Sequence, residues 1–268
     1  MLTPETVRSL ADRLEAAETE RRHIHQFSLE FPEITIDDAY AVQRAWMDLK
    51  KSSGRSVIGH KIGLTSKAMQ YAIHINEPDY GFLLDTMLFQ DGAEIPEGRF
   101  IAAKVEVELA FILGKDLSGP DCTIFDVLRA TEYISPAMEI LDARIQRVDP
   151  VTKSNRTIKD NIADNASDAG IVLGGRPFKP TDPVDLRWVS ALCYRNSSLE
   201  ESGVSAAVLN HPANGVAWLA NKLAPFGETL KAGEIILSGS FIRPVDVKSG
   251  HTIFADYGPL GTVTCHFA

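Results

Sequence analysis

The sequence predicts an α+β fold, in which a helical N-terminal portion precedes a mixed β-sheet or roll. Within residues 1–50, apolar residues recur every three or four positions, as they do on the buried face of a helix. In the second half, apolar and polar residues mostly alternate, which is typical of strands, and one long helix is expected. This order differs from the regular strand–helix alternation of a doubly wound fold.

The N-terminal portion is expected to contain two helices and the first strand. Thr3 is placed to cap the first helix, with Pro4 at its first helical position. A second helix begins at Ile36 and is followed by a polar turn at residues 50–55. Residues 57–66 are predicted to form a strand that leads into a glycine-punctuated turn.

The rest of the chain is expected to be mainly β. The strand at 104–113 is the most regular, because apolar and charged residues alternate before a short apolar run. The polar stretch 141–168 is irregular and is either mobile or wrapped over a site. Helices are predicted at 122–133 and 213–226, and a turn at 200–203. Further strands are predicted at residues 171–175, 184–194, 235–240, 245–247 and 252–267.

Composition narrows the class of protein. A chain of 268 residues can build one full core, so an N-terminal helical portion (1–70) and a β-roll catalytic core (71–268) are expected to form one continuous unit. The net charge of -9 argues against nucleic acid or an anionic membrane as a partner, but one bound cation would still permit an anionic substrate. Three widely spaced cysteines predict no disulfide framework, and no apolar run is long enough to span a membrane. A cytoplasmic protein is expected.

Three carboxylates are candidate metal ligands. Glu106 and Glu108 are two residues apart in the strand 104–113, so their side chains share a face and repel each other unless a cation, a basic partner or solvent neutralises them. Glu139 also lies among apolar residues. An oxygen-only set of this kind favours Mg2+ or Mn2+ over zinc or copper. The alternative is a solvated strand face, but the strand runs directly into an apolar segment.

Lys61 is a long cation inside an apolar, glycine-flanked segment. Its side chain either faces solvent or is directed into a pocket, where it would bind a carboxylate or, with a lowered pKa, move a proton. Asp79, taken alone, is an ordinary turn aspartate after Pro78. No phosphate-binding glycine loop, G-x-S-x-G elbow or H-E-x-x-H motif occurs in the sequence.

Six short motifs together resemble the fumarylacetoacetate-hydrolase superfamily, most closely its hydratase and decarboxylase branch. Each motif alone is weak, but the combination is specific and spans nearly the whole chain. The motifs are G-H-K-I-G-L-T at 59–65, P-D-Y-G at 78–81, E-V-E at 106–108, P-A-M-E at 136–139, A-D-N-A-S at 163–167 and I-L-S-G at 236–239.

The resemblance implies a barrel-like mixed β-roll, a homo-oligomer and a metal-dependent reaction on 2-oxo acids from aromatic ring cleavage. It implies that one Mg2+ or Mn2+ is held by Glu106, Glu108 and Glu139, in agreement with the charge and spacing of these residues. It also implies that Lys61 and Asp79 are the acid–base pair of the reaction.

The expected reaction is addition of water to a small anionic 2-oxo dicarboxylate, with 2-oxohept-4-ene-1,7-dioate as the favoured substrate. Relatives often carry threonine where this chain has Ser238, and the retained hydroxyl makes Ser238 a substrate-binding candidate. The second carboxylate of the substrate requires a cation. Arg243 is a candidate for this role, with Arg144, Arg147 and Arg156 as alternatives.

Several other functions remain open. Decarboxylation of a 4-oxalocrotonate-type substrate, or hydration of 2-oxopent-4-enoate, would use the same metal. Hydrolysis of an acylpyruvate would require a base to activate water, for which His60 and His74 are near the right segments. A non-enzymatic assembly subunit is disfavoured, because such a subunit would be expected to tolerate loss of Lys61, Asp79 or one of the carboxylates.

Overall fold

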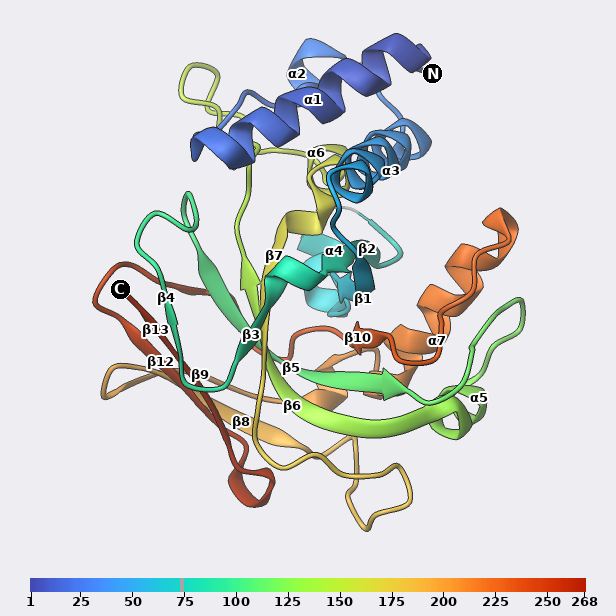
Figure 1. The fold of residues 1–268 in the computed structure, drawn as a ribbon, viewed down its shortest axis with the longest axis vertical. Coiled ribbons are helices and arrows are strands. Elements are labelled where there is room, and N and C mark those ends of the chain that lie inside the picture. Colours follow the sequence, from blue (N-terminus) through green and yellow to red (C-terminus); the bar gives the residue numbers. More distant parts are fainter. Residues whose placement is uncertain (73–74) are drawn as a thin grey trace.

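A computed structural model describes residues 1–72 and 75–268, so His74 lies outside the described residues (Figure 1). The described chain folds into two β-sheets with helices around them. The helices are α1 (Pro4–Glu20), α2 (Phe27–Glu30), α3 (Ile36–Ser52), α4 (Lys67–Ala72), α5 (Ile124–Ala130), α6 (Ile158–Ala163) and α7 (Pro212–Leu223). Among the described residues, no helix is long and apolar enough to cross a membrane.

The first sheet has eight strands and contains most of the predicted site residues. Its order is β2-β1-β10-β5-β6-β7-β3, with β11 also pairing with β5. It is mixed, because β1 runs parallel to β10 and β3 parallel to β7, whereas the other pairs are antiparallel. Its strands are β1 (Val57–Gly63), β2 (Asp79–Leu84), β3 (Leu88–Gln90), β5 (Lys104–Leu113), β6 (Thr131–Leu141), β7 (Asp168–Leu173), β10 (Ile235–Leu237) and β11 (Val245–Asp246).

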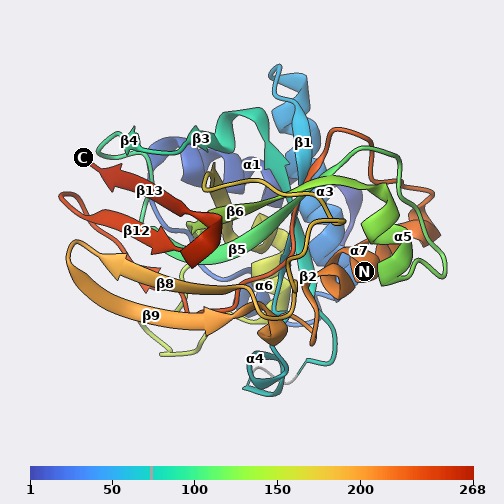
Figure 2. The ribbon, with the colours of Figure 1, turned by 90° about the horizontal axis from the view of Figure 1, so that it is seen from below.

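The second sheet has five strands in the order β4-β13-β12-β8-β9. In Figure 2 its four longer strands lie together as one layer beside β5 and β6. Its strands are β4 (Ala93–Ile95), β8 (Ser190–Arg195), β9 (Ser198–Val204), β12 (Thr252–Asp256) and β13 (Thr262–Phe267). Alternate residues of β12 and β13, such as Ile253 and Val263, are fully buried, so this sheet closes one side of the core.

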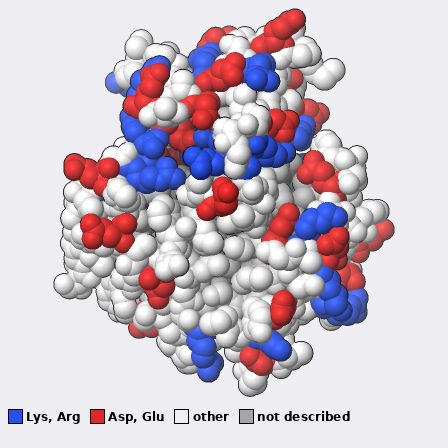
Figure 3. Space-filling model, viewed as in Figure 1, with Lys and Arg blue, Asp and Glu red and all other residues white. Residues whose placement is uncertain are grey.

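Helices α1 and α3 begin where the sequence predicts, whereas the short helix α2 between them was not predicted. The Thr3 side chain accepts a hydrogen bond from the backbone of Thr6 and caps α1, and Thr35 with Asp38 forms a capping box at the start of α3. Helix α3 continues to Ser52, so its end includes the first residues of the polar turn predicted at 50–55. Figure 3 shows that charged side chains gather over this helical portion and its junction with the sheets, whereas much of the sheet surface in the same view is uncharged.

Three predicted elements that follow β5 differ from the structure. The helix predicted at 122–133 ends at Ala130, and β6 begins at Thr131, because this segment pairs with β5 over its whole length. Cross-strand pairing outweighs the helical pattern there. The turn predicted at 200–203 lies inside β9, which forms a hairpin with β8; the reversal is at Asn196. Strand β8 is also shorter than the predicted strand at 184–194.

The N-terminal portion holds the irregular loop between β6 and α6. Ile24 forms a parallel bridge with Ile145, and Gln26 Nε2 donates to the backbone oxygens of Gln146 and Ser154 at 3.3 and 3.0 Å. In Figure 1 this yellow-green loop passes beside α1 and α2. The stretch that the sequence leaves as either mobile or wrapped is therefore fastened to the helices.

Candidate active site and metal centre

The three predicted carboxylates meet on one face of the first sheet. Glu106 and Glu108 lie on β5, and Glu139 lies directly opposite Glu106 on β6. One oxygen from each lies within 4.8 Å of the others. Glu108 and Glu139 are completely buried, whereas Glu106 is partly exposed and therefore marks the open side of the cluster.

The cluster has the properties of a cation site. Glu108 Oε1 and Glu139 Oε2 are buried and have no hydrogen-bond partner in the described protein. Burial and the neighbouring charge of Glu139 raise the pKa of Glu106 to about 8, and burial likewise raises the pKa of Glu108 well above its ordinary value. A divalent cation would relieve this repulsion and satisfy the free oxygens, and three carboxylates are a suitable set for Mg2+ or Mn2+.

Backbone contacts hold Glu108 in place from two sides. Gly239 N–H donates to Glu108 Oε2 at 2.8 Å. Gly239 has φ +121°, and a side chain there would overlap Thr65, so glycine is required. The Tyr257 hydroxyl donates to Glu108 O at 3.0 Å and accepts from Glu108 N at 3.1 Å, which joins the end of β12 to β5 at the metal cluster.

Lys61 and Asp79 lie beside the carboxylates on adjacent strands. Lys61 is on β1 and is 3% exposed; its Nζ is 3.1 Å from Glu139 Oε1 and donates to Ala166 O at 3.0 Å. Asp79 opens β2 opposite Gly63. A Cβ at Gly63 would lie 2.2 Å from Asp79 Oδ1 and 3.2 Å from Lys61 Nζ, so both groups occupy the space that this glycine leaves.

The surroundings raise the pKa of both groups. Burial alone would lower the pKa of Lys61, but the charges of Glu139 and Asp79 outweigh it and raise that pKa above its ordinary value. Lys61 is therefore a cation and not the neutral base that a lowered pKa would give. Burial raises the pKa of Asp79, against the opposing charge of Lys61.

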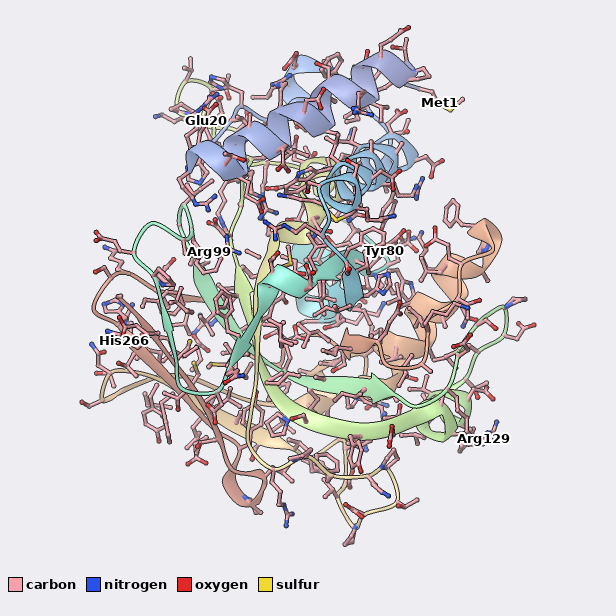
Figure 4. The ribbon with its side chains drawn as sticks, in the orientation of Figure 1. Met1, Glu20, Tyr80, Arg99, Arg129 and His266 are labelled. Carbon is pink, nitrogen blue, oxygen red and sulfur yellow. The ribbon has the colours of Figure 1, made fainter. Side chains whose placement is uncertain are left out.

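Strand β2 is fixed from behind by α3. Tyr80, labelled in Figure 4, stacks on Tyr40 with ring centroids 4.7 Å apart, and Gln43 Nε2 donates to Tyr80 O at 2.8 Å. Asn161 of α6 reaches the other side, donating from Nδ2 to Asp79 Oδ2 at 2.6 Å. Asp79 Oδ1 has no hydrogen-bond partner in the described protein.

The A-D-N-A-S motif is a strained turn that serves the site. Asn165, Ala166 and Ser167 all have left-handed φ values, of 52°, 50° and 62°. Such values in three successive non-glycine residues require surrounding contacts to hold them. The Asn165 side chain accepts from Phe82 N at 2.8 Å and donates to Phe82 O at 2.9 Å. The turn thereby presents the Ala166 carbonyl to Lys61.

Sequence reasoning missed Asp168, a further buried carboxylate on the same face of the sheet. In the β6–β7 pairing, Ile140 is opposite Gly170 and Leu141 is opposite Asp168, so Ala169 is the extra residue of a bulge. The bulge turns Asp168 towards the face that carries Glu139, two residues before Leu141. Asp168 is completely buried, and neither oxygen has a hydrogen-bond partner in the described protein. Its sequence signal is weaker than that of Glu139, because Asp168 follows a polar run and only precedes an apolar segment.

The other candidates differ in position. Ser238 is completely buried, and its Oγ has no partner among the described residues, so it stays a candidate. Arg243 is 81% exposed and pairs with Glu201 of β9 at 2.7 Å, and no described contact joins it to the carboxylates. His60 alternates with Lys61 on β1 and packs on Phe82 at 5.0 Å, on the opposite face of the sheet. It is therefore not placed to act as a base beside the carboxylates.

Comparison with known proteins gives consistent results. Residues 53–268 match the family described as fumarylacetoacetate (FAA) hydrolase, C-terminal. The chain is 59% identical over 258 residues to the 2-oxo-hept-4-ene-1,7-dioate hydratase of Escherichia coli, covering 96% of each chain. It is 41% identical over 238 residues to the 2-hydroxyhexa-2,4-dienoate hydratase of Comamonas testosteroni, covering 88% of each. The 4-oxalocrotonate decarboxylase from Pseudomonas putida G7, complexed with magnesium and adipate, has the same fold, with a TM-score of 0.94 at 35% identity over 100% of this chain and 99% of that one.

These similarities confirm the fold class and the family resemblance that the sequence motifs indicate. The matched region 53–268 includes every strand of both sheets, and with them all the carboxylates of the cluster and Lys61. The chain therefore belongs to the fumarylacetoacetate hydrolase family.

Proposed function

We propose that the protein is a divalent-metal-dependent hydratase that converts 2-oxohept-4-ene-1,7-dioate, or its 2-hydroxy-2,4-diene tautomer, into 4-hydroxy-2-oxoheptane-1,7-dioate during aromatic catabolism. The observation that carries the proposal is the burial of Lys61 and Asp79 beside three carboxylates on one sheet face. The 59% identical relative of that name supports the choice of substrate.

Glu106, Glu108 and Glu139 would hold the cation through their free oxygens. When bound, Mg2+ or Mn2+ would neutralise the C1 carboxylate and the C2 oxygen of the substrate and stabilise the negative charge that develops there. Without that charge, the buried carboxylates would repel a dianionic substrate. Glu106, being partly exposed, lies on the side from which the substrate would approach.

Asp79 and Lys61 supply the proton transfers. Because Asn161 occupies Asp79 Oδ2, the free Oδ1 is the atom that accepts a proton from C3 of the substrate. Return of a proton at C5 moves the double bond from C4–C5 to C3–C4 and makes C4 electron-poor. The oxygen of one water then bonds to C4, and one of its protons ends on C3, so the product is the substrate plus one water. Lys61, kept protonated by its neighbours, is the nearby proton donor.

Decarboxylation is the second candidate, because the structural relative with a TM-score of 0.94 is a decarboxylase. The two reactions are separated by their products. Purified protein with Mg2+ is given freshly prepared 2-hydroxyhepta-2,4-diene-1,7-dioate, and the diene absorbance and the product mass are followed together. A gain of one water that is abolished by chelator supports the hydratase. Loss of CO2 would assign the protein to the decarboxylases, and no change with this substrate would contradict the proposed substrate.

A further inference from the structure

Two arginines of the loop between β6 and α6 lie next to each other. Arg156 N–H donates to Arg147 O at 2.8 Å, and the neighbouring residues Val148 and Asn155 form an antiparallel bridge. Both arginines therefore lie at the base of a small hairpin that the N-terminal helices hold against the sheets. The Arg147 side chain is exposed, whereas that of Arg156 is 15% exposed.

The positive charge in this region exceeds the negative charge that contacts it. Arg144 is completely buried, and all its guanidinium nitrogens are used: Nε donates to the Asp164 carboxylate, and Nη1 and Nη2 donate to the backbone oxygens of Asp168 and Asp164. The Asp164 carboxylate also accepts from the backbone of Arg144 and Ile145. Most of the hydrogen bonds that the Asp164 carboxylate can accept are therefore used by Arg144 and the adjacent backbone.

Arg156 and Arg147 lack a comparable partner. Arg156 Nη2 donates to the neutral Ser167 hydroxyl at 2.9 Å, while its buried Nη1 has no hydrogen bond and lies 3.9 Å from Asp164. The Arg147 side chain makes no hydrogen bond or ion pair with the part of the chain that the structure describes. Burial, together with the charges of Arg147 and Arg144, lowers the pKa of Arg156 to about 10, against the opposing charge of Asp164. A nearby anion would relieve this repulsion.

A short hydrogen-bonded chain connects Arg156 to the proton-transfer residues. Arg156 donates to Ser167 Oγ at 2.9 Å, Ser167 donates to Asn161 Oδ1 at 2.9 Å, and Asn161 donates to Asp79 Oδ2 at 2.6 Å. Arg147 in turn is one of the cations whose charge acts on Glu106, the partly exposed carboxylate of the cluster. Arg156 is thus linked to Asp79 through Ser167 and Asn161, and Arg147 lies next to Arg156 at the base of the hairpin.

We propose that Arg147 and Arg156 bind the distal carboxylate of the substrate and make the enzyme selective for dicarboxylates over shorter monocarboxylates. This inference rests on the proposed hydratase function. A guanidinium binds a carboxylate through two parallel hydrogen bonds, and Arg156 Nη1 and the Arg147 side chain, which have no partner among the described residues, offer donors for it. The other two arginine candidates are less suited, because Arg144 is buried with each of its nitrogens already bonded to Asp164 or Asp168, and Arg243 pairs with Glu201 on the second sheet.

The test compares two substrates in the same enzyme sample. Wild type and the variants Arg147→Gln, Arg156→Gln and Arg156→Lys are assayed with Mg2+ on 2-hydroxyhepta-2,4-diene-1,7-dioate and on 2-hydroxypenta-2,4-dienoate, which has no distal carboxylate. The ratio of kcat/KM for the longer to the shorter substrate should fall about 10- to 100-fold in each glutamine variant, as expected for loss of a hydrogen bond to a charged group. Because the ratio is internal to each sample, partial misfolding does not change it.

The control and rival variants define what would overturn the inference. Arg129→Gln is the matched control, since Arg129 is exposed on α5 and its one ion pair with the described residues is to Asp126; Figure 4 labels it far from the hairpin. Its ratio should equal that of wild type. If Arg147→Gln and Arg156→Gln lower kcat/KM for both substrates by the same factor, the inference is wrong. It is also wrong if only Arg243→Gln changes the ratio. If wild type hydrates neither substrate, the proposed function fails instead, and the two failures are distinguishable.

A binding measurement gives a second readout that does not depend on turnover. Adipate and hexanoate have equal chain lengths but two carboxylates and one, respectively. Calorimetric titration of Mg2+-loaded wild type should show tighter binding of adipate than of hexanoate. In Arg156→Gln the ratio of the two dissociation constants should be smaller by at least about tenfold. Equal affinities of wild type for the two acids would contradict a second carboxylate subsite.

Discussion

Substitution of Gly63 by alanine should disable the site without removing a functional group. Gly63 does not have a left-handed backbone conformation, so alanine is compatible with its φ and ψ angles. The added Cβ, however, would lie 2.2 Å from Asp79 Oδ1 and 3.2 Å from Lys61 Nζ. An ordinary non-bonded contact is about 3.5 Å, so the Asp79 carboxylate has to retreat by about 1 Å.

A displacement of this size has a predictable effect on rate. Misplacing a catalytic group by about 1 Å can lower the rate about 100-fold. We therefore expect kcat of Gly63→Ala to fall by about two orders of magnitude with 2-hydroxyhepta-2,4-diene-1,7-dioate, measured by loss of diene absorbance. Binding of Mn2+, measured by calorimetry, should be close to wild type, because the atoms nearest to the added methyl group belong to Asp79 and Lys61 and not to the three glutamates.

The matched control is Gly227→Ala. Gly227 has φ +69° and no heavy atom within 4 Å of the added Cβ, so this variant has backbone strain but no contact with the site. It should lose about 1 kcal/mol of stability and retain its kcat. Wild-type kcat in Gly63→Ala would refute the role assigned to the position of Asp79. Loss of Mn2+ binding in Gly63→Ala would show instead that the whole site rearranges.

Three further predictions concern charge. Glu139→Gln should weaken Mn2+ binding at least about tenfold in calorimetry, with an unchanged far-UV circular dichroism spectrum. Lys61→Ala should retain Mn2+ binding and lower kcat by about 10²–10⁴-fold. If Lys61→Ala loses Mn2+ binding and Glu139→Gln retains it, the roles assigned to the two residues are wrong. In chelator-treated protein, the free energy of unfolding should fall as the pH rises from 4.5 to about 8, because the pKa of Glu106 is raised on folding and the unfolded state loses its proton first. Denaturant unfolding at a series of pH values measures this. A free energy of unfolding that rises over this range would exclude the raised pKa of Glu106. Asp168→Asn should raise the Tm of the same metal-free protein, by removing a buried carboxylate without a partner, and should lower turnover with Mg2+; a lowered Tm would mean that Asp168 has a stabilising partner.

Local sequence patterns were sufficient to predict elements whose formation depends on one segment of the chain alone. The alternation in residues 104–113 predicts β5 with its bounds, and strand geometry alone places Glu106 and Glu108 on one face. The cap at Thr3 and the start of a helix at Ile36 likewise follow from hydrogen bonds within one turn of helix. The helix predicted at 122–133 fails for the complementary reason, since pairing of β6 with β5 depends on residues distant in the sequence.

The sequence by itself determined which residue types are available: an oxygen-only set of carboxylates, a lysine between glycines, an aspartate after Pro78, and motifs that identify the family. Only the tertiary structure decided their geometry. The β5–β6 register places Glu139 opposite Glu106, and a slip of one residue would turn it away. The bulge that turns Asp168 to the face of Glu139 depends on contacts between distant segments, and so does the strained turn at Ala166. Pairing, register and strain are properties of two segments together, so no pattern within one segment determines them.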